Sequence, residues 1–142
     1  THSLAADHRV VLLVGPPGSG KSRLLRDLRE AGIVNVGKEL ARDLVALPQE
    51  KRSEMAVDLL GQLVESHSSQ VVVLDNIELL LRPELNIELW PALEALSAAK
   101  KLVVAWTGQV TGGSIQWGHP GVPGYRVMSL DNCPAGIISM TG

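Results

Sequence analysis

Aromatic residues are scarce in this 142-residue chain, and phenylalanine is absent altogether. Aromatic residues make up 3% of the sequence, whereas the hydrophobic share is 45%. The core must therefore be aliphatic, and a chain of this length is long enough to bury one such core. We expect a single domain over residues 1–142, with residues 1–8 as a flexible segment.

Cysteine is nearly absent too, since Cys133 is the only one. A single cysteine excludes an intrachain disulfide and fits a reducing cytoplasm. No apolar run approaches the ~20 residues that are needed to span a bilayer, and we expect no signal peptide. These absences predict a cytoplasmic protein that has no membrane partner.

An excess of positive charge is also missing, because the formal net charge is −2. This value argues against a protein that coats nucleic acid through bulk charge. The charge is uneven, however: residues 1–52 carry nine basic and six acidic residues, and residues 53–142 carry four and nine. We interpret the basic first part as an anion-binding loop together with solvated helix faces.

Apolar runs alternate with amphipathic stretches along the chain, which predicts an α/β fold. The predicted strands are 10–14, 33–36, 71–74, 101–106 and 125–130, with a short edge strand through Ile137 and Ile138. The predicted helices are 21–31, 39–47, 51–66 and 85–99. Because the longer strands are nearly all apolar, we expect a single-domain, three-layer fold with a mainly parallel central sheet covered on both faces.

The segment 107–124 is rich in Gly and Pro, unlike the apolar and amphipathic stretches before it. It predicts a long loop or an irregular hairpin through Ile115 and Trp117. Trp117 would then be either a core residue or an exposed contact for a partner.

The strongest motif is GPPGSGKS at residues 15–22, which matches G-x-x-x-x-G-K-[ST] at every fixed position. It follows a predicted strand and opens a predicted helix, so backbone N–H groups and the helix dipole would both face a phosphate. We expect Lys21 to contact the β- and γ-phosphates and Ser22 to offer its hydroxyl to Mg²⁺. The predicted cofactors are ATP and Mg²⁺, and the predicted binding residues are Gly15, Pro16, Pro17, Gly18, Ser19, Gly20, Lys21, Ser22 and Arg23.

A second polar group follows the apolar strand 71–74. Asp75 is predicted to hold Mg²⁺, directly or through water, and its alternative role is a helix N-cap. Asn76 stands where a catalytic glutamate is usual; its amide cannot take a proton from water, but it can orient water by hydrogen bonds. Glu78 would fall in the first turn of a helix that begins at Asn76, either as a base or water-orienting group or as a solvated side chain.

Three further polar residues are candidates for the same site. Thr107 follows the strand 101–106, where it could sense the γ-phosphate or simply end the strand. Arg82 and Arg126 are isolated arginines that could act across a subunit interface as an arginine finger, or could form surface ion pairs. The predicted catalytic set is Lys21, Asn76, Glu78 and Thr107, and the predicted metal ligands are Ser22 and Asp75.

These residues resemble the P-loop NTPases with a displaced glutamate, the group that includes AAA+ and RecA-like proteins. The resemblance covers most of residues 9–130, in the order strand, GPPGSGKS, helix, VVVLD and a polar-ended strand, and it implies the strand order 5-1-4-3-2. Two features are expected to depart from a full AAA+ module: we predict no helical lid after residue 130, and the usual Asp-Glu pair is Asp-Asn. Both departures argue against fast, autonomous ATP hydrolysis.

A closer similarity is carried by LLVGPPGSGKSRLL, VVLDNIELL, VVAWTG and the late pattern Pro-Gly-x-Pro-x-Tyr-Arg. Together they resemble the small P-loop protein of type 3 bacteriophage exclusion (BREX) defence systems. The similarity implies antiviral defence in a bacterial cytoplasm, beside a site-specific DNA methyltransferase and other defence-system proteins.

Three functions remain open on the sequence alone. The first is an ATP-binding switch, or a slow or partner-activated ATPase, that assembles with itself or with larger partners. The second is a small P-loop phosphotransferase. The third is a DNA-binding module whose assembly is controlled by nucleotide, with basic residues gathered in a ring: Arg23, Arg26, Arg29 and Lys38.

Overall fold

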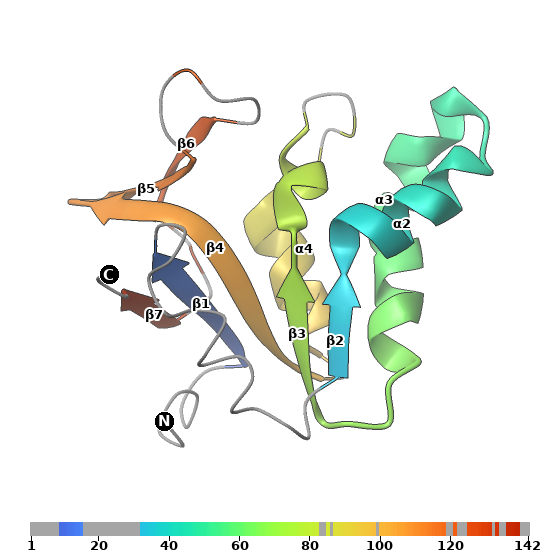
Figure 1. Ribbon diagram of the computed structural model, residues 1–142, viewed down its shortest axis with the longest axis horizontal. Helices are drawn as coiled ribbons and strands as arrows, with labels where there is room; N and C mark the ends of the chain where they lie inside the picture. The colour runs from blue at the N-terminus through green and yellow to red at the C-terminus, as the bar shows by residue number, and fades with distance from the viewer. Residues whose placement is uncertain are drawn as a thin grey trace.

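A computed structural model gives the fold of the chain (Figure 1). It describes residues 9–15, 32–82, 85, 87–98, 100–118, 121, 125–131, 133 and 136–139. Residues 16–31, which contain all of GPPGSGKS after Gly15 and the helix predicted at 21–31, lie outside the described residues. So does most of the segment 119–124.

A parallel sheet forms the centre of the fold. Its strands are β1 (Val10–Gly15), β2 (Gly32–Asn35), β3 (Val71–Asp75), β4 (Lys101–Thr111) and β7 (Gly136–Ser139). They lie in the order β2-β3-β4-β1-β7, and every neighbouring pair along this path is parallel. The α/β class and the mainly parallel sheet are therefore confirmed. The strand β4 separates β1 from β3.

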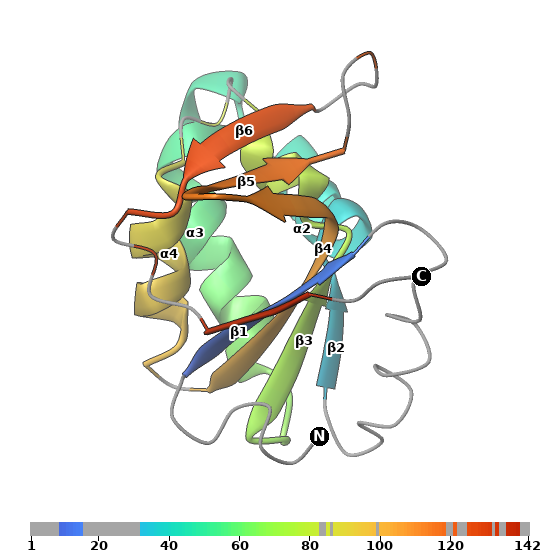
Figure 2. The ribbon, with the colours of Figure 1, turned by 90° about the vertical axis from the view of Figure 1, so that its left-hand side faces the viewer.

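The described helices pack on one face of this sheet, as two views at right angles show (Figures 1 and 2). They are α2 (Val36–Val45), α3 (Gln49–Glu65), the 3₁₀ helix η2 (Ile77–Leu81) and α4 (Leu89–Leu96). Leucine, valine and isoleucine side chains from these helices share one buried cluster with alternate residues of β1, β3 and β4. No helix in the described part of the chain is long and apolar enough to cross a membrane.

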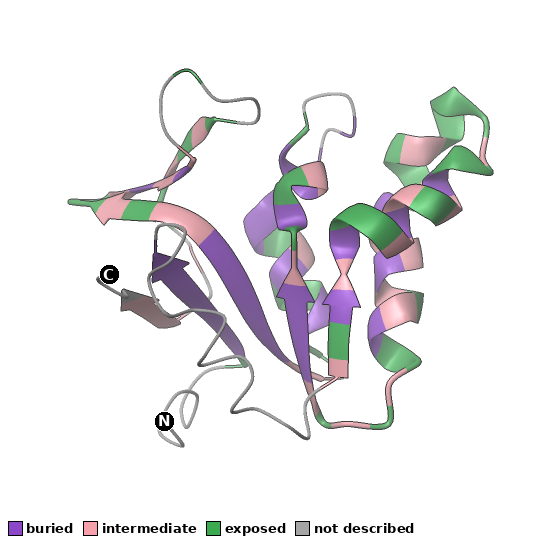
Figure 3. Cartoon of the chain, in the orientation of Figure 1, coloured by how far each residue is buried: buried purple, intermediate pink, exposed green. Residues whose placement is uncertain are grey.

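The opposite face of the sheet is buried as well (Figure 3). The side chains of Val11, Leu13, Val73 and Val103 form a second cluster there, and each is at most 2% exposed. Because β-strand side chains alternate between faces, strands buried on both faces need apolar residues at every position. This explains the uninterrupted apolar runs of the sequence, and it is consistent with a three-layer arrangement.

The strand predicted at 101–106 continues to Thr111, so the prediction of a long loop from Thr107 onward was wrong for its first part. The second half of β4 turns back into β5 (Ser114–Trp117), which pairs antiparallel with it, and β6 (Arg126–Ser129) adds to β5. The hairpin alternative, through Ile115 and Trp117, is the one that the structure has.

Three tryptophans fix this hairpin to the parallel sheet. Trp106 is fully buried, and its ring contacts Trp90 at a centroid distance of 6.2 Å and Trp117 at 5.3 Å. Its indole Nε1 donates a hydrogen bond of 2.8 Å to the backbone oxygen of Gln116. Trp117 is only 7% exposed, so the prediction that it could be an exposed partner contact was wrong. The edge-to-face arrangement of Trp106 and Trp117 is one that aromatic pairs prefer.

Two helix starts differ from the sequence prediction, each for a local reason. The helix α2 begins at Val36 because Asn35 caps it: the Asn35 side chain accepts from the backbone N–H of Lys38 at 3.1 Å, and Glu39 accepts from the N–H of Asn35 at 2.9 Å. The helix α4 begins only at Leu89, because Pro91 has no N–H and suits the first turn of a helix, where that donor has no intrahelical partner.

Candidate active site

Several predicted site residues that the structure describes lie at the carboxyl-terminal edge of the parallel sheet. Gly15, the first residue of the GPPGSGKS motif, ends β1 and lies in register with Thr107 on the neighbouring strand β4. Asp75 ends β3 on the other side of β4, and it lies in register with Asn35 at the end of β2. In open α/β sheets this edge is where ligands bind.

Asp75 is half-buried, and only one of its two carboxylate oxygens accepts a hydrogen bond from the described part of the chain. Its Oδ1 accepts a 3.0 Å hydrogen bond from the backbone N–H of Asn76. Within the described part of the chain, Oδ2 has no hydrogen bond or ion pair. The alternative role of Asp75 as a helix N-cap is wrong, because the N-cap of η2 is Asn76.

Among the described residues, no group of three or more His, Cys, Asp or Glu side chains could hold a metal ion. A dedicated protein cage is therefore not formed by this part of the chain. Mg²⁺, however, is usually held by one or two carboxylates with phosphate oxygens and waters. One carboxylate at the end of β3, with an oxygen still available, fits that requirement.

Asn76 adopts the left-handed conformation, with φ 55° and ψ 50°. It is the only described non-glycine residue with a positive φ. Asparagine tolerates this region better than other residues with a side chain, whereas a longer acid such as glutamate is disfavoured there. The turn from β3 into η2 thus gives a backbone reason for an asparagine directly after Asp75.

The amide nitrogen of the Asn76 side chain is held by a hydrogen bond. Its Nδ2 donates a 3.2 Å hydrogen bond to Oδ1 of Asn35, the same oxygen that caps α2. Among the described residues, nothing donates to Oδ1 of Asn76, so this oxygen remains available as an acceptor. Asn76 can therefore hold a water molecule by accepting from it, but its amide cannot remove the proton.

Asn35 is a site residue that the sequence reasoning missed. It connects three elements, because it ends β2, caps α2 and holds Asn76. The signal in the sequence is an asparagine followed by Glu39, which reaches back to its N–H. Gly37 belongs to the same contact, since a Cβ there would lie 3.3 Å from the backbone oxygen of Asn76. This glycine lets the first turn of α2 approach the end of β3 closely.

Glu78 lies in the first turn of η2, as the sequence predicted, and its side chain is exposed. It has no hydrogen bond or ion pair within the described residues. Thr107 is half-buried, and its backbone oxygen accepts a 2.8 Å bond from the N–H of Gly118. It does not end its strand, as the alternative interpretation required; it lies where β4 leaves β1 and begins to pair with β5.

The two predicted arginine-finger candidates differ in their contacts. Arg126 is half-buried, and its guanidinium donates a 3.3 Å hydrogen bond to the backbone oxygen of Leu81 at the end of η2. Arg82 is exposed, and in the described part of the chain its side chain has no hydrogen bond or ion pair. Arg126 therefore joins β6 to η2 within its own chain, and Arg82 is the candidate that could reach another molecule.

The rest of the predicted nucleotide site lies outside the described residues. This applies to Pro16, Pro17, Gly18, Ser19, Gly20, Lys21, Ser22 and Arg23, and also to Arg26 and Arg29. Lys38, the fourth residue of the predicted basic surface, is exposed on α2. The described geometry thus places Gly15, Thr107, Asp75 and Asn76 at the same edge of the sheet. Glu78 lies two residues further along the chain.

Comparisons with protein-family models and with curated protein sequences find no match for this chain. The case for its function therefore comes from the sequence motif and from the geometry of the sheet edge.

The left-handed turn gives a prediction for stability. Replacement of Asn76 by glutamate is expected to lower the free energy of unfolding by about 1–2 kcal/mol, because a residue with an extended side chain is strained at this φ. Replacement by glycine should change it by less than about 1 kcal/mol, since glycine adopts positive φ without strain. Urea unfolding of both variants tests this. Equal stability of Asn76→Glu and the unmodified chain would contradict the backbone explanation.

Proposed function

We propose that this chain is an ATP-binding protein and a slow or partner-dependent ATPase that acts as an assembly switch. The observation that carries the proposal is the meeting of the motif's first glycine with two polar residues, Thr107 and Asp75, at one edge of the sheet. The GPPGSGKS motif starts at Gly15, next to Thr107, and Asp75 ends the strand on the far side of β4. The strand order, with β4 between β1 and β3, agrees with the order that the resemblance to P-loop NTPases implies.

In this proposal each residue has a distinct task. Lys21 binds the phosphates together with the backbone N–H groups of Gly15 and residues 18–22, since Pro16 and Pro17 have none. Ser22 and Asp75 hold Mg²⁺, which supplies charge neutralisation on the phosphate oxygens when it is bound. Thr107, beside Gly15, would contact the terminal phosphate. The nucleotide is thereby positioned across β1, β4 and β3.

Slow turnover follows from the groups near the attacking water. Asn76 can accept a hydrogen bond from that water, and its amide is held by Asn35 at 3.2 Å. If Asn76 only orients the water, the proton that the water loses must pass to the phosphate, to solvent or to Glu78. Glu78 is exposed on η2. Full activity would then need a group from a neighbour, and the exposed Arg82 is our candidate for an arginine finger in a second copy.

The biological setting in this proposal rests on the similarity of sequence patterns to the type 3 BREX protein. In that setting the chain would switch the assembly of a bacterial anti-phage system, with itself and with other defence-system proteins as partners. Nucleotide-dependent ordering of segments at the sheet edge would change the surface that is offered to those partners.

The experiment that tests the proposal is ATP turnover per subunit, measured over a wide range of protein concentration. We expect a slow rate that rises with concentration, because the completing group comes from a second subunit. Glu78→Gln run beside the unmodified chain decides whether Glu78 is the base. A fast rate that is independent of concentration would contradict a partner-dependent site.

A further inference from the structure

Helix α2 presents an exposed basic stripe that ends in a large apolar side chain. Lys38, Arg42 and Val45 recur at positions i, i+4 and i+7, which places them on one face of the helix. Lys38 is exposed, the side chain of Arg42 is 69% exposed, and Val45 is 71% exposed. Val45 is the most exposed of the large hydrophobic residues that the structure describes. This stripe therefore offers both positive charge and apolar surface to another molecule.

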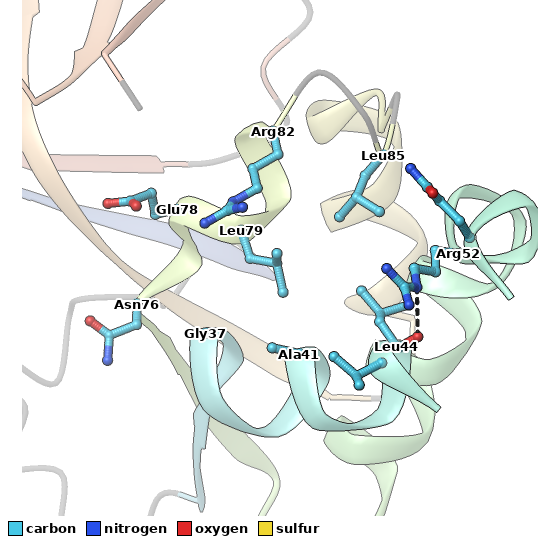
Figure 4. Close-up of a pocket in the computed structure, with 11 residues that line it drawn as sticks. Gly37, Ala41, Leu44, Arg52, Asn76, Glu78, Leu79, Arg82 and Leu85 are labelled. Atoms are coloured by element: carbon cyan, nitrogen blue, oxygen red, sulfur yellow. Dashed lines mark hydrogen bonds between the residues drawn. The ribbon is translucent and has the colours of Figure 1, made fainter. Parts of the chain in front are cut away.

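The other side of α2 is occupied within the chain. Figure 4 shows Ala41 and Leu44 on the side of the helix that faces Leu79 of η2. The buried residues of the helix are Val36, Leu40 and Leu44. The packing of α2 on the fold thus leaves the basic stripe as its free face.

The acidic residues of α2 do not cancel the charge of this stripe. Glu39 is half-buried, and it accepts a 2.9 Å hydrogen bond from the backbone N–H of Asn35. Asp43 forms an ion pair with Arg42 in which Nε and Oδ1 are 3.9 Å apart. An exposed pair at this distance contributes little, so Arg42 can exchange it for a carboxylate of another molecule.

A pocket of about 670 Å³ lies between the start of α4 and β6. Its apolar lining is firmly packed, because Ile87 and Trp90 are each 8% exposed and Met128 is half-buried. The indole Nε1 of Trp90 donates a 3.0 Å hydrogen bond to the backbone oxygen of Ser129, which joins α4 to β6 across this region. The pocket is therefore a fixed hollow that can receive an apolar side chain.

Most of the exposed residues that line this pocket are acidic. Glu88, Glu94 and Asp131 are exposed, and in the part of the chain that the structure describes their carboxylates have no hydrogen bond or ion pair. The basic residue of the lining, Arg126, is half-buried and donates to the backbone oxygen of Leu81. The pocket thus combines an apolar lining with net negative charge, which complements the stripe on α2.

We propose that the pocket between α4 and β6 binds the basic stripe of α2 from a second copy of the chain. Val45 packs against the apolar lining around Trp90, and Lys38 and Arg42 face the carboxylates of the pocket. The helix α2 lies at the right of Figure 1 and β6 at the left, so two copies joined in this way still expose one stripe and one pocket. The contact therefore repeats head to tail.

This contact names the partner surface for the self-assembly in the proposed function, and it rests on that function only in that the chain assembles with itself. Asn35, which caps α2 and accepts from the side chain of Asn76, joins the stripe's helix to the proposed nucleotide site. The stripe and the pocket include neither Asp75 nor the GPPGSGKS motif. We therefore expect association without nucleotide, and its failure is distinguishable from a failure to bind ATP.

The test is sedimentation velocity of the full chain without nucleotide, over a wide range of protein concentration. We expect the average mass to rise with concentration, and the association to weaken in high salt because exposed charges are screened. Arg42→Glu on the stripe and Glu94→Lys in the pocket are each expected to raise the dissociation constant by about tenfold or more. Val45→Ser should also raise it, without any change of charge.

Matched controls on α3 make the same charge changes outside the contact. Lys51→Glu corresponds to Arg42→Glu, and Glu54→Lys corresponds to Glu94→Lys; both control residues are exposed. They should leave the dissociation constant nearly unchanged, apart from an effect of overall charge that salt screens.

A mixture of Arg42→Glu and Glu94→Lys decides whether the two surfaces bind each other. The first variant has an unmodified pocket, and the second has an unmodified stripe. The mixture therefore regains the native contact between unlike chains, and we expect it to associate more strongly than either variant alone.

Four results would overturn the proposal. The first is a mass of the unmodified chain that does not rise with concentration. The second is an equal effect of the interface variants and their controls on α3, which would reflect overall charge only. The third is an unchanged dissociation constant in Val45→Ser. The fourth is a mixture that associates no more strongly than its two components. Circular dichroism shows whether each variant is folded, and an unfolded variant is replaced by Arg42→Gln or Glu94→Gln.

Discussion

Replacement of Lys21 by alanine is expected to weaken ATP binding by about a hundredfold or more, because a buried phosphate loses a charge-assisted contact that acts at close range. Lys21 is the charged residue at a fixed position of GPPGSGKS. Isothermal titration calorimetry of the variant against the unmodified chain measures the effect. The free energy of unfolding should change little, since in this proposal Lys21 contacts the ligand.

A matched control for this variant is Lys38→Ala. Lys38 is an exposed lysine on α2 and lies outside the motif. It should leave ATP affinity unchanged apart from a small electrostatic effect that salt screens. If Lys21→Ala and Lys38→Ala lowered the affinity equally, ATP would be attracted by the general positive charge of the first part of the chain and not by the motif.

Replacement of Gly108 by alanine is expected to lower the free energy of unfolding by about 2–4 kcal/mol, because the added methyl group has no room. A Cβ at Gly108 would lie 1.8 Å from the backbone oxygen of Gln116, the same oxygen that accepts from Trp106. The antiparallel pair of β4 and β5 must therefore separate, and the buried indole loses its partner. Chemical denaturation of the purified variant measures this loss.

Gly113→Ala is the matched control for the hairpin. Gly113 lies in the turn between β4 and β5, and nothing lies within 4 Å of a Cβ built there. This change should alter the free energy of unfolding by less than about 1 kcal/mol. Similar losses in both variants would show that the hairpin responds to any lost glycine, and would contradict the close approach at Gly108.

The sequence predicted the parallel sheet well, because its strands are buried on both faces. Such strands read as unbroken apolar runs, as in β1, β3 and the first half of β4, and burial alone identifies them. The Asp75 position could also be predicted, since a polar residue that ends such a run must lie at the edge of the sheet. The helix α3 was predicted within two residues at its start and one at its end, because its apolar residues recur at helical spacing.

The features that were missed depend on contacts between residues far apart in the chain. The continuation of β4 to Thr111 is stabilised by pairing with β5 and by the contact of Trp106 with Trp117, and its Gly and Thr residues suggest a loop when taken alone. The link between Asn35 and Asn76 spans 41 positions.

The left-handed conformation of Asn76 also changes how its residue type is interpreted. On the sequence alone, asparagine after Asp75 indicates a displaced catalytic base. In the structure the same residue suits the turn from β3 into the 3₁₀ helix η2, so the backbone also favours asparagine there. Asn76→Glu should therefore be tested for stability before its turnover is interpreted, because strain could mask a gain in base catalysis.

The most direct test of the central proposal is a calorimetric titration of the unmodified chain with ATP in the presence and absence of Mg²⁺. We expect one saturable site per chain, with tighter binding when Mg²⁺ is present, because Asp75 and the phosphates would share the ion. The absence of saturable binding up to about 1 mM ATP, an affinity of only about 4 kcal/mol, would contradict the proposal that this sheet edge is a nucleotide site.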